Sequence, residues 1–197
     1  VWRRILCLTI VLSGATLVAK DLRVTLTMLR WIAGTIFSVF IAGGAAAEVD
    51  LFGVDRIVDA VERNDPDAVN GMLARGVNAN SVDSNRRTVL MIAANAGNEG
   101  MVRLLLQYRA NPNVTDLLGN SALAYAALQG HVAVIDVLIG GHANPNAENK
   151  QGLTPLIQAA AAGYADAVQA LLDRKADALR RDYTGRTALM WAERNRK

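Results

Sequence analysis

The sequence predicts an all-α fold, a solenoid of about four to five helix-turn-helix repeats with β-hairpin tips, preceded by an N-terminal signal segment. The first observation is a period of 33 residues, at which glycine, leucine and alanine return: Gly97, Gly130 and Gly163; Leu90, Leu123, Leu156 and Leu189; Ala93, Ala126, Ala159 and Ala192. The second is an apolar stretch at residues 31–47 that does not share the period. A period repeats like residues along an axis, whereas an enzyme needs unlike residues at one place. Most of the chain therefore specifies a stacked scaffold.

The predicted repeat domain covers residues 48–197. Its units are a degenerate first copy, three complete copies and a truncated cap, with the boundaries 50–82, 83–115, 116–148, 149–181 and 182–197. Each complete copy carries a hydroxyl residue, a leucine and paired alanines, which read T-V-L-M-I-A-A, S-A-L-A-Y-A-A and T-P-L-I-Q-A-A. The cap begins a further copy at Thr187.

Each unit is predicted to open with a short helix. Thr88, Ser121, Thr154 and Thr187 can accept hydrogen bonds from the free backbone N–H groups of a first turn, and Pro155 suits that turn because its missing N–H is not needed there. The small alanines let the first helices of adjacent repeats approach closely, since longer side chains would push the layers apart. Gly97, Gly130 and Gly163 are then expected to end the first helices in a turn of positive φ.

A second helix follows in each unit, with apolar residues at helical spacing such as Val102, Leu105 and Leu106. It ends at a position that holds Gly76 in the first copy and a larger residue in the others: Arg109, His142 and Lys175. We expect these three residues to be left-handed, at a cost on the order of 1 kcal/mol each. At the start of each tip, Asp83, Asp116 and Asp182 are expected to bond to the backbone of their own turn.

These phrases resemble the T-P-L-H-x-A-A motif of the ankyrin-repeat family, over residues 50 to 197 approximately. The His of the motif is replaced by Met91, Ala124, Ile157 and Met190. The resemblance implies recognition of proteins by the hairpin tips and the concave face of the first helices. It also implies that His131, which follows Gly130, bonds within its own repeat.

Residues 1–47 are interpreted as a leader. Trp31 to Ala47 is uncharged and apolar, follows Arg30, and ends in three alanines before Glu48, which is the order of a secretory signal. The stretch is shorter than the roughly 20 residues that a membrane span needs. We expect translation to start at Met28 and cleavage to follow Ala47. An uncleaved anchor or a double-pass hairpin is the alternative, because residues 5–19 form a second apolar run.

If residues 1–47 are a leader, the net positive charge of the chain belongs to the leader and not to the repeats. The 21 basic and 18 acidic side chains include five and one in residues 1–47, which leaves 16 and 17 for the repeats. A nearly neutral repeat domain gives little support to nucleic-acid binding, although the C-terminal end is basic and could face an acidic partner. Cys7 lies in the leader, so the mature chain would contain no cysteine. It needs no disulfide, because about 150 residues can bury an adequate core.

No pattern in the sequence indicates catalysis. His131 and His142 occupy repeat positions, and Ser121 occupies the helix-capping position, so each has a structural explanation. Nothing resembles a paired acid and base, a phosphate loop or a zinc cluster. We expect no enzyme activity, no cofactor and no metal site.

The tip of the third repeat departs most from the period, because it carries Leu117 and Leu118 where the other tips are polar. Two adjacent leucines on a solvated turn predict a contact patch; the alternative is that one packs against a neighbouring hairpin. With residues of the inner helix and later tips, they are expected to form one partner-binding stripe: Leu117, Leu118, Asn120, Leu128, Gln129, Lys150, Leu153 and Tyr183.

We therefore expect a periplasmic or secreted bacterial protein, monomeric and non-catalytic, that binds a protein partner and no nucleic acid. The resemblance to exported bacterial proteins that accompany stress enzymes suggests an accessory role for a periplasmic enzyme. The alternatives are a membrane-tethered scaffold, if the N-terminal segment is uncleaved, and a secreted effector that binds host proteins.

Overall fold

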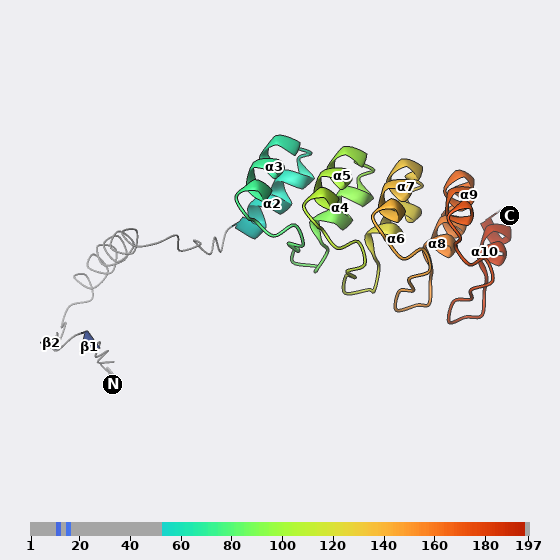
Figure 1. The fold of residues 1–197 in the computed structure, drawn as a ribbon. Coiled ribbons are helices and arrows are strands. Elements are labelled where there is room, and N and C mark those ends of the chain that lie inside the picture. Colours follow the sequence, from blue (N-terminus) through green and yellow to red (C-terminus); the bar gives the residue numbers. More distant parts are fainter. Residues whose placement is uncertain (1–10, 13–14, 17–52, 196–197) are drawn as a thin grey trace, which may run out of the picture. The chain divides into compact units, whose positions relative to one another are not determined.

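The structure, a computed structural model, describes residues 11–12, 15–16 and 53–195 (Figure 1). Residues 50–197 form a compact unit of their own. In the preceding unit, β1 (Val11–Leu12) pairs antiparallel with β2 (Ala15–Thr16), with Val11 opposite Thr16. The predicted signal segment, with its start at Met28 and its cleavage position after Ala47, lies outside the described residues.

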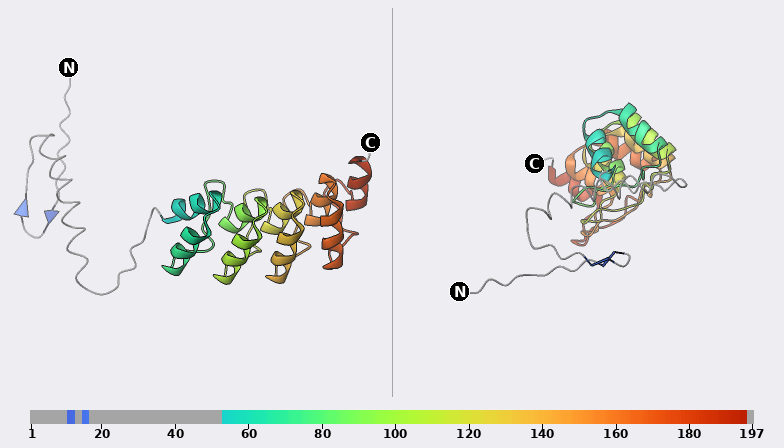
Figure 2. Two further views of the ribbon diagram at one scale, coloured as in Figure 1. Left: turned by 90° about the horizontal axis from the view of Figure 1, so that it is seen from above. Right: turned by 90° about the vertical axis from the view of Figure 1, so that its left-hand side faces the viewer.

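Residues 53–195 fold into helices that stand in two rows (Figures 1 and 2). The inner row holds the first helix of each repeat: α2 (Gly53–Glu62), α4 (Val89–Asn95), α6 (Ala122–Leu128), α8 (Pro155–Ala162) and α10 (Ala188–Asn195). The outer row holds the second helices: α3 (Pro66–Ala74), α5 (Glu99–Gln107), α7 (Val132–Gly140) and α9 (Ala165–Asp173). Each helix packs on its neighbours within its row, and each of α2, α4, α6 and α8 also packs on the second helix of its own repeat. The predicted helix-turn-helix solenoid is confirmed for these residues.

The helix starts follow the predicted caps. The hydroxyl oxygens of Thr88, Ser121 and Thr154 accept hydrogen bonds from the backbone three residues later, at 3.2, 3.3 and 3.3 Å. Each bond satisfies a backbone N–H that no carbonyl of the helix can reach. The register of the inner row is thus fixed by local sequence.

The helix ends are left-handed, as predicted. Gly97, Gly130 and Gly163 have φ of 72°, 74° and 84°. At the end of the second helices Arg109, His142 and Lys175 have φ of 63°, 67° and 66°, although none is a glycine. The packed core on both sides of these turns holds the strain, because adjacent apolar residues such as Leu105, Leu138 and Leu171 are fully buried.

The hairpin tips differ from the prediction in one respect. Within residues 53–195 they carry no β-ladder, and one isolated bridge joins Val82 to Thr88. Each tip is closed by two backbone hydrogen bonds; in the third repeat the Asp116 amide donates to the Asn120 carbonyl at 3.0 Å and the Gly119 amide donates to the Asp116 carbonyl at 3.1 Å. The reason is local, because a side-chain oxygen takes the amides that a second strand would otherwise pair. The tips are tight turns and not two-stranded ribbons.

Close packing of the inner row depends on alanine. Ala93, Ala126 and Ala159 are at most 1% exposed, and each lies on a helix that contacts the inner helix of the next repeat. This placement confirms the predicted role of the small residues in stacking. Among the described residues, no helix is both long enough and apolar enough to cross a membrane.

Candidate binding surface

The tips are built around an Asp or Asn at the first position of each turn. Asp116 Oδ1 accepts hydrogen bonds from the amides of Leu118 and Asn120, both at 2.8 Å, and Asn149 Oδ1 accepts from Gln151 and Leu153 at 2.9 and 3.0 Å. Asp83 and Asp182 make the same pair of bonds in their own tips. The expectation that these residues bond to their own turn is confirmed. The turns are therefore rigid supports for the side chains at their apex.

The leucine pair of the third tip is exposed. Leu117 is 52% and Leu118 64% exposed, so neither side chain is buried against a neighbouring hairpin. The backbone beneath them is fixed, because the Leu118 carbonyl accepts a hydrogen bond from the Lys150 amide at 3.0 Å. Gly119 lies so close to this contact that a Cβ there would stand 2.9 Å from Lys150 N. Two apolar side chains thus project from a rigid junction between two tips.

The tip of the fourth repeat lies next to the tip of the third repeat, and the tip of the C-terminal cap lies next to that of the fourth. Lys150 is exposed, and the Tyr183 amide donates a hydrogen bond to the Gln151 carbonyl at 3.2 Å. The exposed ring of Tyr183 covers Gly152, where a Cβ would meet the ring at 2.6 Å. Leu117, Leu118, Lys150 and Tyr183 therefore form one continuous surface, which we call the tip edge.

The other predicted stripe residues lie elsewhere. Asn120 Oδ1 accepts hydrogen bonds from Asn149 and Gln158 at 2.9 and 3.2 Å, so it joins the third repeat to the fourth. Leu153 is partly buried and packs against the core. Leu128 is exposed and Gln129 donates to Asn95 Oδ1 at 3.1 Å, but both lie at the far end of α6 from the tip. That helix separates them from the tip edge by about 10 Å. A binding role for any of these residues stays a prediction.

Two hydrogen bonds from aromatic side chains to the tip aspartates were not predicted from the sequence. Tyr125 donates to Asp116 Oδ2 at 2.7 Å, and Trp191 donates to Asp182 Oδ2 at 2.9 Å. Burial and the bond to Asp116 raise the pKa of Tyr125 to about 12. Burial alone would raise the pKa of Asp182, but hydrogen bonds from Thr184, Arg186 and Trp191 outweigh it and lower that pKa to about 2. The sequence signal for these two bonds was an aromatic donor nine residues after Asp116 and after Asp182.

His131 is placed differently from the expectation drawn from the resemblance. Its Nε2 lies 3.2 Å from the Asn95 carbonyl, which belongs to the preceding repeat and not to its own. The ring also covers Gly97, where a Cβ would stand 2.7 Å away. The histidine therefore joins two repeats. Across the described part of the chain, no three His, Cys, Asp or Glu side chains are grouped so that they could hold a metal ion.

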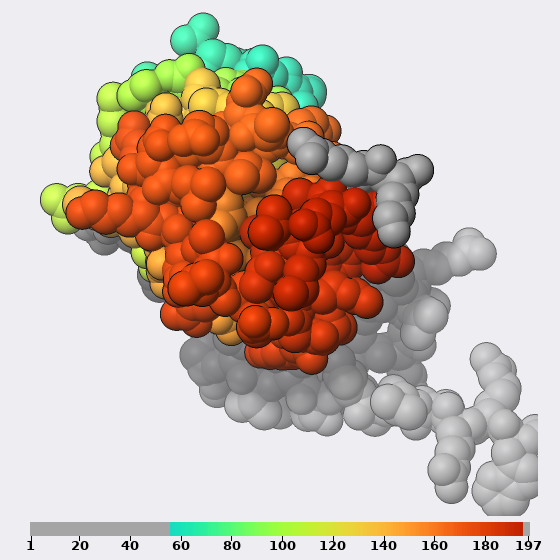
Figure 3. Space-filling model, turned by 90° about the vertical axis from the view of Figure 1, so that its right-hand side faces the viewer, coloured from blue at the N-terminus to red at the C-terminus, as the bar shows by residue number. Residues whose placement is uncertain are grey.

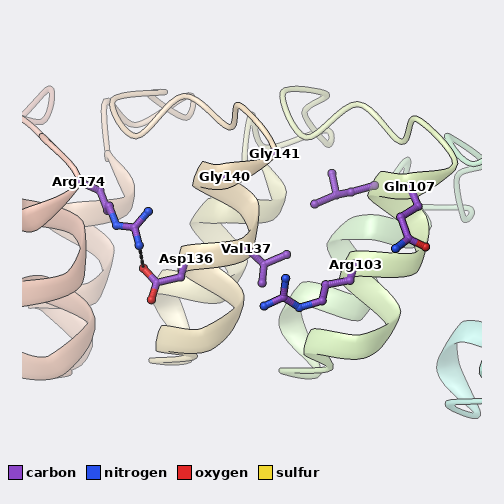
Figure 4. A pocket seen from close by; sticks show the side chains of 8 residues that line it. Arg103, Gln107, Asp136, Val137, Gly140, Gly141 and Arg174 are labelled. Carbon is purple, nitrogen blue, oxygen red and sulfur yellow. Dashed lines mark ion pairs between the residues drawn. The ribbon is translucent and has the colours of Figure 1, made fainter.

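A groove crosses the outer row between α5, α7 and α9 (Figure 4). It exists because Gly140 and Gly141 stand where the next repeat has Asp173 and Arg174. Its charged groups are already paired, Arg174 with Asp136 at 3.1 Å and Arg103 with Glu99 at 2.7 Å. The groove thus offers no uncompensated charge to a ligand, and the tip edge remains the better candidate for recognition.

Comparison with protein families agrees with the geometry. The family model for ankyrin repeats, described as three copies, matches residues 57–149 and 133–197. No curated protein matches the chain. The matched segments together cover more than half of the sequence and coincide with the stacked helix pairs. The chain belongs to the ankyrin-repeat family.

Proposed function

We propose that this chain is an exported, non-catalytic protein that binds a protein partner through the tip edge. Ankyrin repeats are in general interaction modules, which supports the class of function. The observation that carries the assignment to the tip edge is the exposed pair Leu117 and Leu118 on a rigid turn. A few desolvated apolar residues can dominate the affinity of an interface, and a rigid support lowers the entropy lost on binding.

The location and the process are also proposed. The apolar stretch of residues 31–47, followed by alanines and Glu48, supports export to the periplasm or the medium. In the periplasm the protein would serve as an accessory to an enzyme that it binds. Tethering by an uncleaved N-terminus, and action on host proteins after secretion, are the two alternatives.

The test replaces Leu117 and Leu118 together by Ser. Native protein and variant are used to recover partners from the cell envelope, and the recovered partner is titrated against both. We expect at least about tenfold weaker binding, because the apolar centre of the interface is lost. Circular dichroism and thermal melting of the same variant should be unchanged, since both side chains are exposed.

The matched control is Leu172→Ser, which removes an exposed leucine from α9 outside the tips. This control should bind as the native protein does. Binding that survives Leu117→Ser with Leu118→Ser within about twofold contradicts the assignment and directs attention to Leu128 and Gln129.

A further inference from the structure

The inner helix α10 exposes positions that are covered in every earlier repeat. Leu90, Leu123 and Leu156 are at most 1% exposed, whereas Leu189 at the same register is 68% exposed. The next position along the helix shows the same difference, because Ile157 is 1% exposed and Met190, 33 residues later, is 45% exposed. In the earlier repeats the next inner helix contacts the helix that carries these side chains. The end of the described solenoid, seen in Figure 3, thus has the apolar character of a stacking face.

A ladder of asparagines crosses the repeats and stops at this face. Asn80, Asn113 and Asn146 each accept, through Oδ1, a hydrogen bond from an amide 31 residues later in the next repeat, at 2.7, 2.8 and 2.8 Å. The same register position in the last described repeat is Leu179, which is 83% exposed. A leucine cannot accept a hydrogen bond. A further repeat stacked here would therefore lack the hydrogen bond that joins the earlier repeats at this position.

A second copy of this chain stacked on this face would thus lose one of the contacts that hold neighbouring repeats together. Leu179 favours an apolar neighbour, because it is an exposed apolar side chain, as Leu189 and Met190 are. We call these three residues the end face.

The charges around the end face are mostly positive. Arg186 and Arg194 lie over the ring of Trp191, 5.3 and 5.5 Å from its centroid, and Trp191 is itself held by Asp182. Among the described residues, ion pairs are absent at four cations of this end: Lys175, Arg181, Arg186 and Arg194. Glu193, one turn after Leu189, is the exposed acid on α10. The surplus favours an acidic partner.

We propose that the end face binds an acidic amphipathic helix of a protein partner. The apolar side of that helix covers Leu179, Leu189 and Met190, as the next inner helix covers the equivalent residues elsewhere in the solenoid. Its carboxylates meet Arg186 and Arg194, whose guanidinium groups are already oriented by Trp191. This surface is distinct from Leu117 and Leu118, which lie in the third repeat.

The probe is a fluorescein-labelled peptide of about 18 residues with Leu at helical spacing and Glu on its other face. Two control peptides are a scramble of the same composition, in which the leucines share no face, and a version with Lys in place of Glu. Fluorescence anisotropy with the full chain should show the acidic helix binding at least about tenfold more tightly than either control, with affinity falling as salt rises. Equal binding of the three peptides overturns the proposal.

Variants of the full chain locate the site. Leu189→Ser with Met190→Ser, and separately Leu179→Asn, should weaken the acidic peptide by about tenfold and threefold, while Leu117→Ser with Leu118→Ser should leave it unchanged. Because all three end-face residues are exposed, the melting curves should not move. Undiminished binding after loss of Leu189 and Met190 contradicts the proposal.

Sedimentation velocity tests the rival occupant. We expect the full chain to remain of one size over a hundredfold range of concentration. A concentration-dependent dimer that Leu189→Ser with Met190→Ser abolishes would assign the end face to a second copy instead. Failure of the tip-edge test leaves this result untouched, because the two sets of variants share no residue.

Discussion

At the scale of single residues, each tip starts with an Asp or an Asn, and the partner of the second terminal atom, Oδ2 in Asp or Nδ2 in Asn, explains which of the two is present. In all four tips Oδ1 accepts two amides of the turn. The second oxygen of Asp83, Asp116 and Asp182 meets a donor, respectively from Arg87, Tyr125 and Trp191. Asn149 instead donates from Nδ2 to an acceptor, Asn120 Oδ1. A carboxylate therefore stands where the neighbour donates, and an amide where it accepts.

The lowered pKa of Asp182 predicts a loss of stability in acid. Because the folded pKa of about 2 lies below the ordinary value of 3.8, the contribution of Asp182 is fully present above about pH 4 and is lost as the pH falls towards 2. Thermal melting followed by circular dichroism between pH 2 and pH 6 measures it. The control is Asp182→Asn, which keeps one acceptor but turns an N–H donor towards Trp191.

We expect Asp182→Asn to be less stable at pH 6 and to lose less stability than the native protein on acidification. Parallel curves for the two proteins would contradict the assignment, because the acid loss would then come from other carboxylates.

Residue-scale features were predictable where their cause is local. The caps at Thr88 and Ser121 and the left-handed Arg109 depend on neighbours within a few positions, and the sequence predicts them correctly. The bond from His131 to Asn95 and the one from Gln158 to Asn120 join different repeats. They depend on how far one repeat is rotated against the next, and no local pattern contains that rotation.

At the scale of the helices, stacking of the inner row sets a limit on side-chain size. Ala126 and Ala159 are fully buried on α6 and α8, which contact each other directly. We expect Ala126→Leu or Ala159→Leu to destabilise the array by more than about 1 kcal/mol, because an overpacked contact forces the helices apart. Urea denaturation of the full chain measures the change.

The matched control is Ala133→Leu, which places the same side chain on the exposed surface of α7. Its urea midpoint should stay close to that of the native protein. If all three variants unfold alike, close approach of the inner helices is not what these alanines provide.

The helices of the repeats were predictable because the same sequence signals occur in each repeat. Hydroxyl cap, paired alanine and glycine occur in order in repeats two, three and four, so one unit confirms the next. The predicted β-hairpin character of the tips was wrong because Asp116 and its equivalents satisfy the amides that a ladder would need. At the tips, these side-chain hydrogen bonds replace the β-ladder of the hairpin that the resemblance implies.

At the scale of the whole molecule, the division between leader and repeats makes a prediction about processing. Small Ala45 and Ala47 frame a cleavage position after an apolar run of signal-peptide length. N-terminal sequencing of the exported protein should therefore begin at Glu48. Residues from before Met28 in that product would contradict both the cleavage and the proposed start, and would favour the tethered alternative.

The C-terminal end of the described array and the tip of the third repeat show where the repeated pattern stops predicting the structure. The sequence pattern assigns Leu189 the same role as Leu156, yet one is exposed and the other buried, because burial of this position depends on the following neighbour. The tip edge was predictable in part, since Leu117 and Leu118 break the pattern visibly. The separation of Leu128 from that edge was not, because it follows from the direction of α6 relative to the tip.

The asparagine ladder has a consequence for the order in which the chain acquires its structure. In each rung the acceptor, such as Asn113, belongs to the earlier repeat and the amide that it receives belongs to the later one. The rings of His131 and Tyr164 likewise settle on glycines of the repeat before them. The earlier repeat is also the one that is synthesised first. Each later repeat can therefore dock on groups that the chain already contains, which allows structure to grow from the N-terminal repeats towards the C-terminus.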